Sequence, residues 1–345
     1  MKRLAATLMS LPLAACAAGA APVPPSDPAP AAREASFTWH ASAGPAGARR
    51  YRLFVPASYD GSRPVPLLVM LHGCTQDPDD FARGTRMNAV AEERGMLVAY
   101  PEQTAAMNPQ KCWNWFDPAH QERGRGEPED VARIAREVMA SHRVDPARVY
   151  VAGVSAGGSM ALNVAAAYPE LFAAAGTHSG IVYRAAVGLQ HALGAMQRGA
   201  ADTAGLGAAV TAAMGERARP LPVIVFHGGV DPVVRVVNAE QTAFQWAAAS
   251  GLAGRPLRPM MDQVYGPPPP GADPRPLGPS PDSFHPTSTR FLDERDRTVL
   301  EMWVVPGLGH AWSGGSPEGT YTDARGPDAS REMVRFFLEH PREAR

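Results

Sequence analysis

The sequence predicts an α/β fold in which helices flank both faces of a mostly parallel central sheet. Apolar runs of strand length alternate along the chain with segments that have apolar residues at helical spacing. Two runs, Val65–Leu71 and Leu221–Phe226, are almost continuously apolar, as expected for strands covered on both faces. A third run, Arg148–Ala152, leads through a Gly-Val-Ser-Ala-Gly turn into a helical pattern, which continues the alternation. Such an order favours right-handed crossovers between parallel strands.

The size and charge of the chain narrow the function classes. Its 345 residues suffice for a large core, and without an internal repeat we expect one catalytic domain over residues 35–345. The 33 basic residues nearly balance the 34 acidic ones, and no block of lysine or arginine stands out. The electrostatic signature of a nucleic-acid binder is therefore missing. Nothing in the sequence identifies a protein partner.

The first 16 residues have the pattern of an export signal. Positive charge in Met1–Arg3 precedes an apolar run, Leu4–Leu13, that is too short to span a bilayer. The next residues complete Leu13-Ala-Ala-Cys16, which resembles a bacterial lipobox and implies cleavage before Cys16 and a lipid anchor on its thiol. The alternative is cleavage at the following alanines and free secretion. Residues 17–34, rich in Ala and Pro, predict a disordered tether, so we expect an exported protein, at the periplasmic face of a membrane or secreted.

Periodicity and turn residues predict the remaining elements. In chain order these are a hairpin (Ser36–His40 with Arg49–Val55), a helix (Phe81–Glu93), a strand (Gly95–Tyr100), helices over Asp130–His142 and Ser159–Ala167, a strand (Phe172–Gly176), a helix (Asn238–Ser250), a hairpin (Thr287–Leu292 with Thr298–Val305) and a last helix (Asp328–His340). Asp130 is expected to help start its helix. The Ala/Gly-rich segment 183–219 fits either helical packing or a lid. Residues 254–287 are dominated by Pro, Gly and Asp, and predict an irregular surface insertion.

The turn Gly153-Val-Ser-Ala-Gly157 marks a candidate nucleophile. A tight turn between a strand and a helix holds its serine in a strained backbone conformation, and glycines leave room for the close approach. The motif alone arises by chance in glycine-rich chains, so the flanking strand and helix carry the inference. We therefore predict that Ser155 is the nucleophile of a hydrolase; the alternative is an ordinary glycine-rich turn.

A serine nucleophile needs a histidine base and a carboxylate that orients it, and on this kind of turn they follow in the order serine, acid, histidine. His310 follows a strand, whereas His285 lies in the proline-rich insertion and His340 near the end of a helix. Asp231 comes directly after the strand that ends at Phe226. The other aspartates of this region lie in irregular or Ala/Gly-rich stretches: Asp202, Asp262, Asp273 and Asp282. We predict Asp231 as the acid and His310 as the base.

The oxyanion of a tetrahedral intermediate needs preorganised N–H donors. We predict the N–H of Ala156 and one N–H of the loop His72–Gln76, from Cys74 or Thr75. Once Cys16 is lipidated, two cysteines remain in an oxidising compartment, and a Cys74–Cys112 disulfide is expected. The alternative is a pair of free buried thiols.

Aromatic and histidine residues near strand ends have two interpretations each. Trp113, Trp115 and Trp312 could line the substrate cleft or simply pack in the core. Three histidines, at positions 72, 178 and 227, also lie at strand ends. No H-E-x-x-H or similar ligand spacing occurs, so we expect these histidines to be hydrogen-bonded and predict neither a metal nor a cofactor.

Five motifs, together with the tail 316–338, resemble the polyhydroxybutyrate depolymerase/feruloyl esterase group of the α/β-hydrolase superfamily. They are His72-Gly-Cys-Thr-Gln76, Cys112-Trp-Asn-Trp-Phe116, Gly153-Val-Ser-Ala-Gly157, His227-Gly-Gly-Val-Asp231 and Gly309-His-Ala-Trp-Ser-Gly-Gly315. The resemblance implies an α/β-hydrolase fold, a triad of Ser155, Asp231 and His310, and the Cys74–Cys112 bridge.

The resemblance also implies a function. We expect an exported serine carboxylic-ester hydrolase that cleaves hydroxyalkanoate oligomers or related short esters through an acyl-enzyme. A feruloyl or acetyl-xylan esterase is the alternative within enzymes, and a non-catalytic surface-binding lipoprotein is the alternative from another class. Secreted polyester depolymerases usually append a polymer-binding domain, which does not follow the last helix here, so oligomers are expected rather than crystalline polymer.

Overall fold

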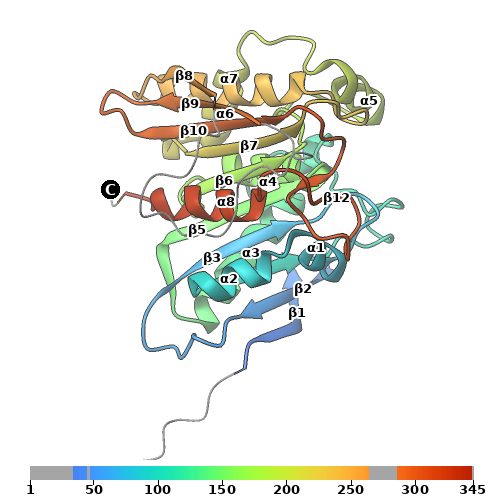
Figure 1. The fold of residues 1–345 in the computed structure, drawn as a ribbon, viewed down its shortest axis with the longest axis vertical. Coiled ribbons are helices and arrows are strands. Elements are labelled where there is room, and N and C mark those ends of the chain that lie inside the picture. The colour runs from blue at the N-terminus through green and yellow to red at the C-terminus, as the bar shows by residue number, and fades with distance from the viewer. Residues whose placement is uncertain (1–33, 45–46, 264–285, 344–345) are drawn as a thin grey trace, which may run out of the picture. The chain divides into compact units, whose positions relative to one another are not determined.

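A large twisted sheet forms the centre of the computed structural model, which describes residues 34–44, 47–263 and 286–343 (Figure 1). Within these residues the sheet has ten strands in the order β1-β2-β4-β3-β5-β6-β7-β10-β9-β8. Their bounds are β1 (Ser36–Gly44), β2 (Gly47–Val55), β3 (Val65–Leu71), β4 (Leu97–Pro101), β5 (Val144–Val154), β6 (Ala174–His178), β7 (Val223–Gly228), β8 (Arg258–Gln263), β9 (Thr287–Leu292) and β10 (Thr298–Val305).

The six central strands, from β4 to β10, are parallel, and the strands outside them are antiparallel. Every residue of β3 is buried, which is why its sequence is an unbroken apolar run. The predicted hairpins are present as β1–β2 and β9–β10. The predicted α/β architecture with a mostly parallel sheet is therefore confirmed.

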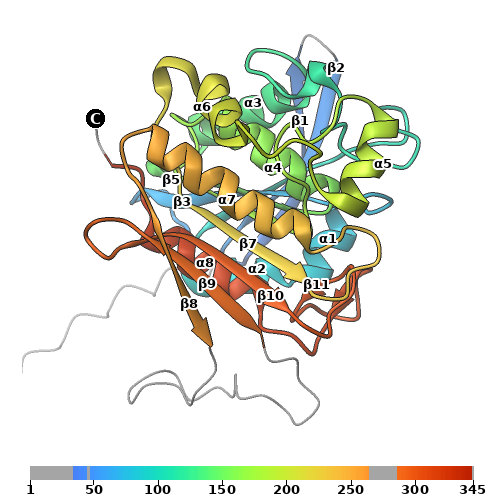
Figure 2. The same cartoon turned by 90° about the horizontal axis from the view of Figure 1, so that it is seen from above.

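Helices cover both faces of the sheet (Figure 2). On one face, α3, α4, α6 and α7 pack over side chains such as Leu67 and Val69, and α1, α2 and α8 cover Leu68 and Met70 on the other. The bounds are α1 (Pro78–Thr85), α2 (Met87–Arg94), α3 (Gly126–Ser141), α4 (Ala156–Ala167), α5 (Leu189–Arg198), α6 (Leu206–Met214), α7 (Val237–Leu252) and α8 (Ala329–Glu339), with short 3₁₀ turns at Pro118–His120 and Gly215–Arg217 and a two-stranded ribbon of β11 (Trp312–Ser313) and β12 (Thr322–Asp323). Alternating residues of one strand thus serve two separate cores.

The single helix predicted over Phe81–Glu93 is wrong, because the chain breaks there into α1 and α2. Arg86 adopts a left-handed conformation with φ 53°, which ends the first helix. The Thr85 hydroxyl donates to Phe81 O and accepts the Met87 N–H, so a side chain replaces the interrupted helical bonds. The Arg86 guanidinium then reaches Gly314 O, far along the chain.

Two further predictions are corrected. Helix α3 begins at Gly126, so Asp130 lies in its second turn and does not start the helix; its carboxylate pairs instead with Arg49 of β2. The insertion expected to be irregular contains strand β8, which pairs with β9. Within the described residues no helix has the length and apolar character needed to cross a bilayer. The predicted export signal, Cys16 and the tether up to residue 33 lie outside the described residues.

Candidate active site

Ser155 lies on the sharp turn between β5 and α4, with φ 55° and ψ −123°. This strained conformation is held by a hydrogen bond from Ser155 N–H to His178 O, 2.8 Å long. A side chain at Gly157 would come within 2.1 Å of Leu71 O, and one at Gly153 within 2.5 Å of the Gly157 backbone. The two glycines of the motif are therefore required by close backbone packing, which lifts the serine to the carboxyl end of the sheet.

The structure brings Ser155, His310 and Asp231 into one hydrogen-bonded chain. Ser155 Oγ lies 3.0 Å from His310 Nε2, and His310 Nδ1 lies 2.7 Å from Asp231 Oδ2. These are the distances over which a serine hydroxyl can pass its proton to an imidazole that a carboxylate orients. The arrangement can therefore generate an alkoxide-like nucleophile.

Asp231 is buried and keeps its charge through its partners. Its Oδ1 accepts the N–H groups of Val233 and Val234, each at 2.9 Å, which leaves Oδ2 for His310. Burial alone would raise the pKa of Asp231, but the hydrogen bond and charge of His310 and the Val234 N–H bring this pKa below its usual value. The carboxylate thus stays ionised and fixes the His310 tautomer that leaves Nε2 free to accept a proton.

The loop His72–Gln76 lies beside the nucleophile, since a side chain at Gly73 would contact Ser155 Cβ at 3.6 Å. Of the two donors that we predicted from this loop, Thr75 is excluded, because its N–H already donates to Gln110 O at 2.7 Å. The Cys74 N–H has no partner among the described residues. Ala156 is the first residue of α4, so its N–H is not used within the helix. Ala156 and Cys74 remain the candidate oxyanion donors.

A disulfide joins Cys74 to Cys112, as predicted. The bridge ties the loop that carries the candidate donor to the aromatic segment around Trp113. The Trp113 indole N–H donates to His72 O at 3.1 Å, so the same segment holds the loop at a second point.

Of the two roles that we considered for Trp113, Trp115 and Trp312, the structure favours packing in the core over lining a substrate cleft. Their exposed fractions are 0% for Trp113, 5% for Trp115 and 1% for Trp312. Trp312 stacks on His178 at 5.1 Å and donates its indole N–H to Ser330 Oγ, and Trp115 packs edge-on against Phe116. A ring that is buried in this way has no face open to a ligand.

The buried histidines His72, His178 and His227 are all hydrogen-bonded. Burial lowers the pKa of His72 to about 4 and that of His178 to about 3, and it also lowers the pKa of His227. His178 Nε2 accepts the Ser313 N–H at 3.0 Å, which anchors the loop that carries His310. His227 Nε2–H donates to Val234 O at 2.8 Å, next to the acid. Among the residues that the structure describes, no cluster of three or more His, Cys, Asp or Glu side chains could hold a metal ion.

Two residues of the site were missed by sequence reasoning. Tyr321, half exposed, places its hydroxyl 3.2 Å from Thr75 Oγ1 at the edge of the candidate oxyanion loop. Gln103 lies two residues after β4 and contacts both His72 and Cys112. The rule that site residues follow strands could have indicated Gln103, but an amide has no catalytic signature of its own. For Tyr321 we find no signal in the sequence.

Comparison with known proteins identifies a family for the chain. A family model described as "Esterase PHB depolymerase" matches residues 49–255, more than half of the chain. The chain is similar to poly(3-hydroxyalkanoate) depolymerase C of Paucimonas lemoignei, with 34% identity over 200 residues that cover 55% of this chain and 46% of the relative. It is also similar to feruloyl esterase B of Thermothelomyces thermophilus, with 27% identity over 230 residues, 64% of this chain and 74% of the relative.

Among solved structures, an acetyl xylan esterase from Aspergillus awamori has a TM-score of 0.65 at 18% identity, and the match covers 88% of this chain and 99% of that one. This likeness shows a shared fold. The match to the depolymerase spans less than half of that protein's length. The chain has the α/β-hydrolase fold and belongs to the esterase PHB depolymerase family.

Proposed function

We propose that the protein is a serine esterase that works through an acyl-enzyme. The observation that carries the proposal is the hydrogen-bonded chain from Ser155 Oγ through His310 to Asp231. Ser155 Oγ attacks the ester carbonyl carbon while its proton passes to His310 Nε2. The resulting oxyanion accepts hydrogen bonds from the N–H groups of Ala156 and Cys74. His310 then protonates the leaving alcohol, and a water molecule releases the acid by the same steps in reverse order.

We propose hydroxyalkanoate oligomers or related short esters as the substrates. The similarity to a poly(3-hydroxyalkanoate) depolymerase supports this choice. So do the exposed apolar side chains beside the acid: Val230 is 58% exposed and Val233 39%. Leu189 and Leu193 of α5 are 61% and 58% exposed, and α5 lies against the same loop, where its Gln197 Nε2 donates to Val233 O. An aliphatic polyester chain is a chemical match for such a surface.

A feruloyl or acetyl-xylan esterase is the second candidate. The match to feruloyl esterase B covers 74% of that protein, whereas the match to the depolymerase covers 46% of the depolymerase. Measuring kcat/KM on a hydroxybutyrate trimer, methyl ferulate and acetylated xylan separates the two candidates. We expect the trimer to have the highest value, and a clear preference for ferulate or xylan would replace our substrate proposal.

The mechanism is tested with Ser155→Ala and with an active-site phosphonate. We expect the wild type to show a burst with a chromogenic short-chain ester, the phosphonate to label Ser155, and the variant to lose nearly all turnover. Turnover at the wild-type rate in the variant would exclude Ser155 as the nucleophile. A wild type that neither turns over esters nor reacts with the phosphonate would favour the non-catalytic binding lipoprotein.

A further inference from the structure

We propose that Gln103 is a positioning residue that holds the candidate oxyanion loop, residues 72–76, at both of its anchor points. The inference rests on the proposed esterase function and adds a residue to it. Gln103 is fully buried and lies just after β4, on the loop next to the parallel strand β3, which leads into the oxyanion loop.

The first anchor is His72, where the loop begins. The backbone N–H of Gln103 donates to His72 Nε2 at 3.0 Å, and His72 Nδ1–H donates to Gly73 O at 2.7 Å. A neutral imidazole has one donor and one acceptor, so the two bonds are compatible only with this tautomer. Burial lowers the pKa of His72 to about 4, which keeps the ring neutral near pH 7. The ring thus links Gln103 directly to the loop backbone.

The second anchor is the Cys74–Cys112 bridge. The side-chain amide of Gln103 donates from Nε2 to Cys112 O at 3.0 Å, on the residue that the disulfide joins to Cys74. The side chain of Gln103 therefore restrains Cys74, whose N–H is the candidate oxyanion donor, through Cys112 and the disulfide. Gln103 thus contacts His72 directly, through its backbone, and is linked to Cys74 through Cys112 and the disulfide.

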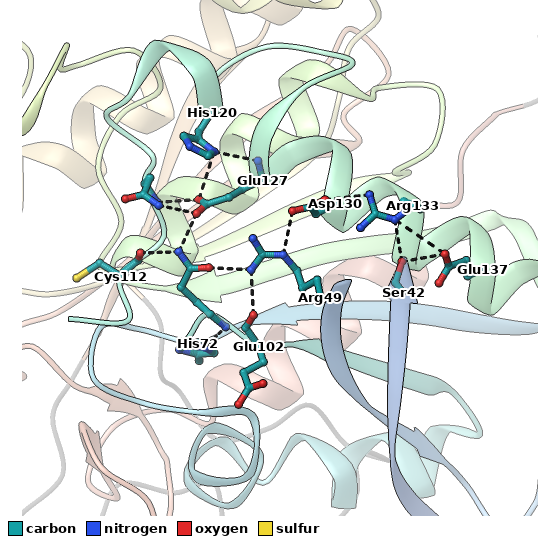
Figure 3. Close-up of polar contacts among 12 residues, drawn as sticks. Ser42, Arg49, His72, Glu102, Cys112, His120, Glu127, Asp130, Arg133 and Glu137 are labelled. Carbon is teal, nitrogen blue, oxygen red and sulfur yellow. Dashed lines mark hydrogen bonds and ion pairs between the residues drawn. The ribbon is translucent and has the colours of Figure 1, made fainter. Parts of the chain in front are cut away.

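The charges around Gln103 explain why an amide stands here. Its Nε2 also donates to Glu127 Oε1 at 2.7 Å, and its Oε1 accepts from Arg49 Nη1 at 2.7 Å. The buried Arg49 pairs with Asp130 of α3 at 3.1 Å (Figure 3). Only an amide can donate to a carboxylate and a carbonyl while it accepts from a guanidinium. A carboxylate at this position would face Glu127 with like charge and lose the donor to Cys112.

Glu127 is in turn fixed by the aromatic segment. Its Oε2 accepts the Asn114 N–H at 2.7 Å and its Oε1 accepts from Asn114 Nδ2 at 2.7 Å. The amide of Gln103 therefore cannot rotate without breaking its three side-chain hydrogen bonds, to Glu127, Cys112 and Arg49. This buried network ties the oxyanion loop to the aromatic segment and to α3.

The consequence for catalysis concerns the transition state. The negative charge on the oxygen develops only as Ser155 attacks. A displaced Cys74 N–H therefore stabilises the transition state less, while the binding of the ester is little changed. Displacements of about 1 Å at such a site cost about a hundredfold in rate. Loss of the Gln103 side-chain bonds should therefore lower kcat and leave KM nearly unchanged.

The test compares Gln103→Met with Gln245→Met. Gln245 is equally buried and binds Tyr183 N, Tyr183 O and Leu206 O from α7, away from the oxyanion loop. Methionine keeps the length of either side chain and removes its hydrogen bonds. We expect both variants to lose thermal stability, but only Gln103→Met to lower kcat, about ten- to a hundredfold, with KM within about twofold of the wild type.

Phosphonate labelling separates this proposal from the proposed function. The phosphonyl oxygen occupies the oxyanion site, so we expect Gln103→Met to be labelled more slowly by a similar factor. A wild type that is not labelled at all would instead refute the esterase function. Equal kcat and equal labelling rates in the wild type and Gln103→Met would overturn the positioning role. If Gln103→Met does not fold, Glu127→Gln takes its place with an expected several-fold loss of kcat; if that variant keeps its kcat, or neither folds, the proposal is overturned.

Discussion

Asp231 illustrates how single residues define proton positions in this site. Both of its carboxylate oxygens are used, one by N–H groups of its own turn and the other by His310. Its neighbour His227 lies 3.8 Å away but donates to Val234 O, so it does not compete for the same oxygen. The acid can therefore orient only one imidazole.

Asp231→Asn should leave the fold intact and remove most of the activity. The asparagine amide would donate to His310 Nδ1 and force the proton onto Nε2, which then cannot accept from Ser155. We expect kcat to fall by about 10⁴-fold, the size of effect seen for an inverted tautomer in serine hydrolases. Asp293→Asn is the matched control, because Asp293 is buried in the β9–β10 turn and also accepts two N–H groups there. A loss of kcat in the control as large as in Asp231→Asn would show that the effect is not specific to the acid.

The sequence predicted the residues whose position follows from a rule about strand ends. Ser155, Asp231 and His310 each follow a parallel strand, so the topology alone brings them together. Trp113 and Trp312 show the limit of residue type as a signal. A large ring predicts burial, but whether it packs in a core or faces a cavity depends on contacts with segments far along the chain.

The oxyanion loop and its disulfide are the elements on which the site geometry depends most. The bridge joins Cys74 to Cys112 across a sequence separation of 38 residues. Its sulfur atoms connect the end of a central strand to a segment without regular structure. Breaking the bridge should therefore affect both stability and rate.

The double variant Cys74→Ser, Cys112→Ser should unfold at a lower temperature and turn over more slowly. Opening a loop of this length costs about 4 kcal/mol of stability in the chain-entropy model, and the freed loop no longer fixes the Cys74 N–H. Calorimetry and ester kinetics measure the two effects separately. Cys16→Ser, which removes the third cysteine, should change neither. An unchanged kcat in the double variant would mean that the loop holds its position without the bridge.

Element boundaries were harder to predict than the order of elements. The break at Arg86 depends on contacts with Gly314, more than two hundred residues later, which no local pattern reports. Helix α3 starts at Gly126, and the preceding Arg125 makes no capping hydrogen bond with its side chain. The sequence therefore offered no capping residue at the true start, and we placed the start at Asp130. Strand β8 contains a proline and forms because β9 offers it a partner.

The whole molecule carries several ionisable groups that are buried at the carboxyl edge of the sheet. His72 and His178 are neutral in the folded state, with pKa values of about 4 and about 3. Burial is the main cause for both. For His178, the charges of His227 and His310 lower the pKa further, while Asp231 raises it.

Stability should fall as the pH drops below about 6.5. An unfolded histidine binds a proton near that pH, whereas the folded protein binds it only near pH 4 or 3, so the unfolded state takes up more protons throughout this window. The contribution is fully present above pH 6.5 and is lost by pH 3. Melting temperatures recorded from pH 7.5 to 4 test this, with His191→Gln, which replaces an exposed histidine of α5, as a control. A melting temperature that stays flat over this range would contradict neutral buried histidines.

Cys16→Ser should release the protein from membranes without altering its chemistry. If Cys16 carries a lipid, the wild type is recovered with the membrane fraction and the variant in the soluble fraction, with equal kcat on a soluble ester. The residues that form the candidate site all lie beyond residue 71, which is the reason for the unchanged rate. A wild type found only in the soluble fraction would favour the alternative of free secretion.

The hydrogen bond between Thr75 and Tyr321 joins residues that are 246 positions apart, and other bonds link Thr320 to Asp80 and Gln76 in the same region. Contacts of such long range form late in folding, because the intervening chain must first be ordered. His310 and Tyr321 both follow the oxyanion loop by more than two hundred residues, so they are synthesised well after it. We therefore expect a nascent chain that ends before His310 to lack the complete hydrogen-bonded chain from Ser155 to Asp231.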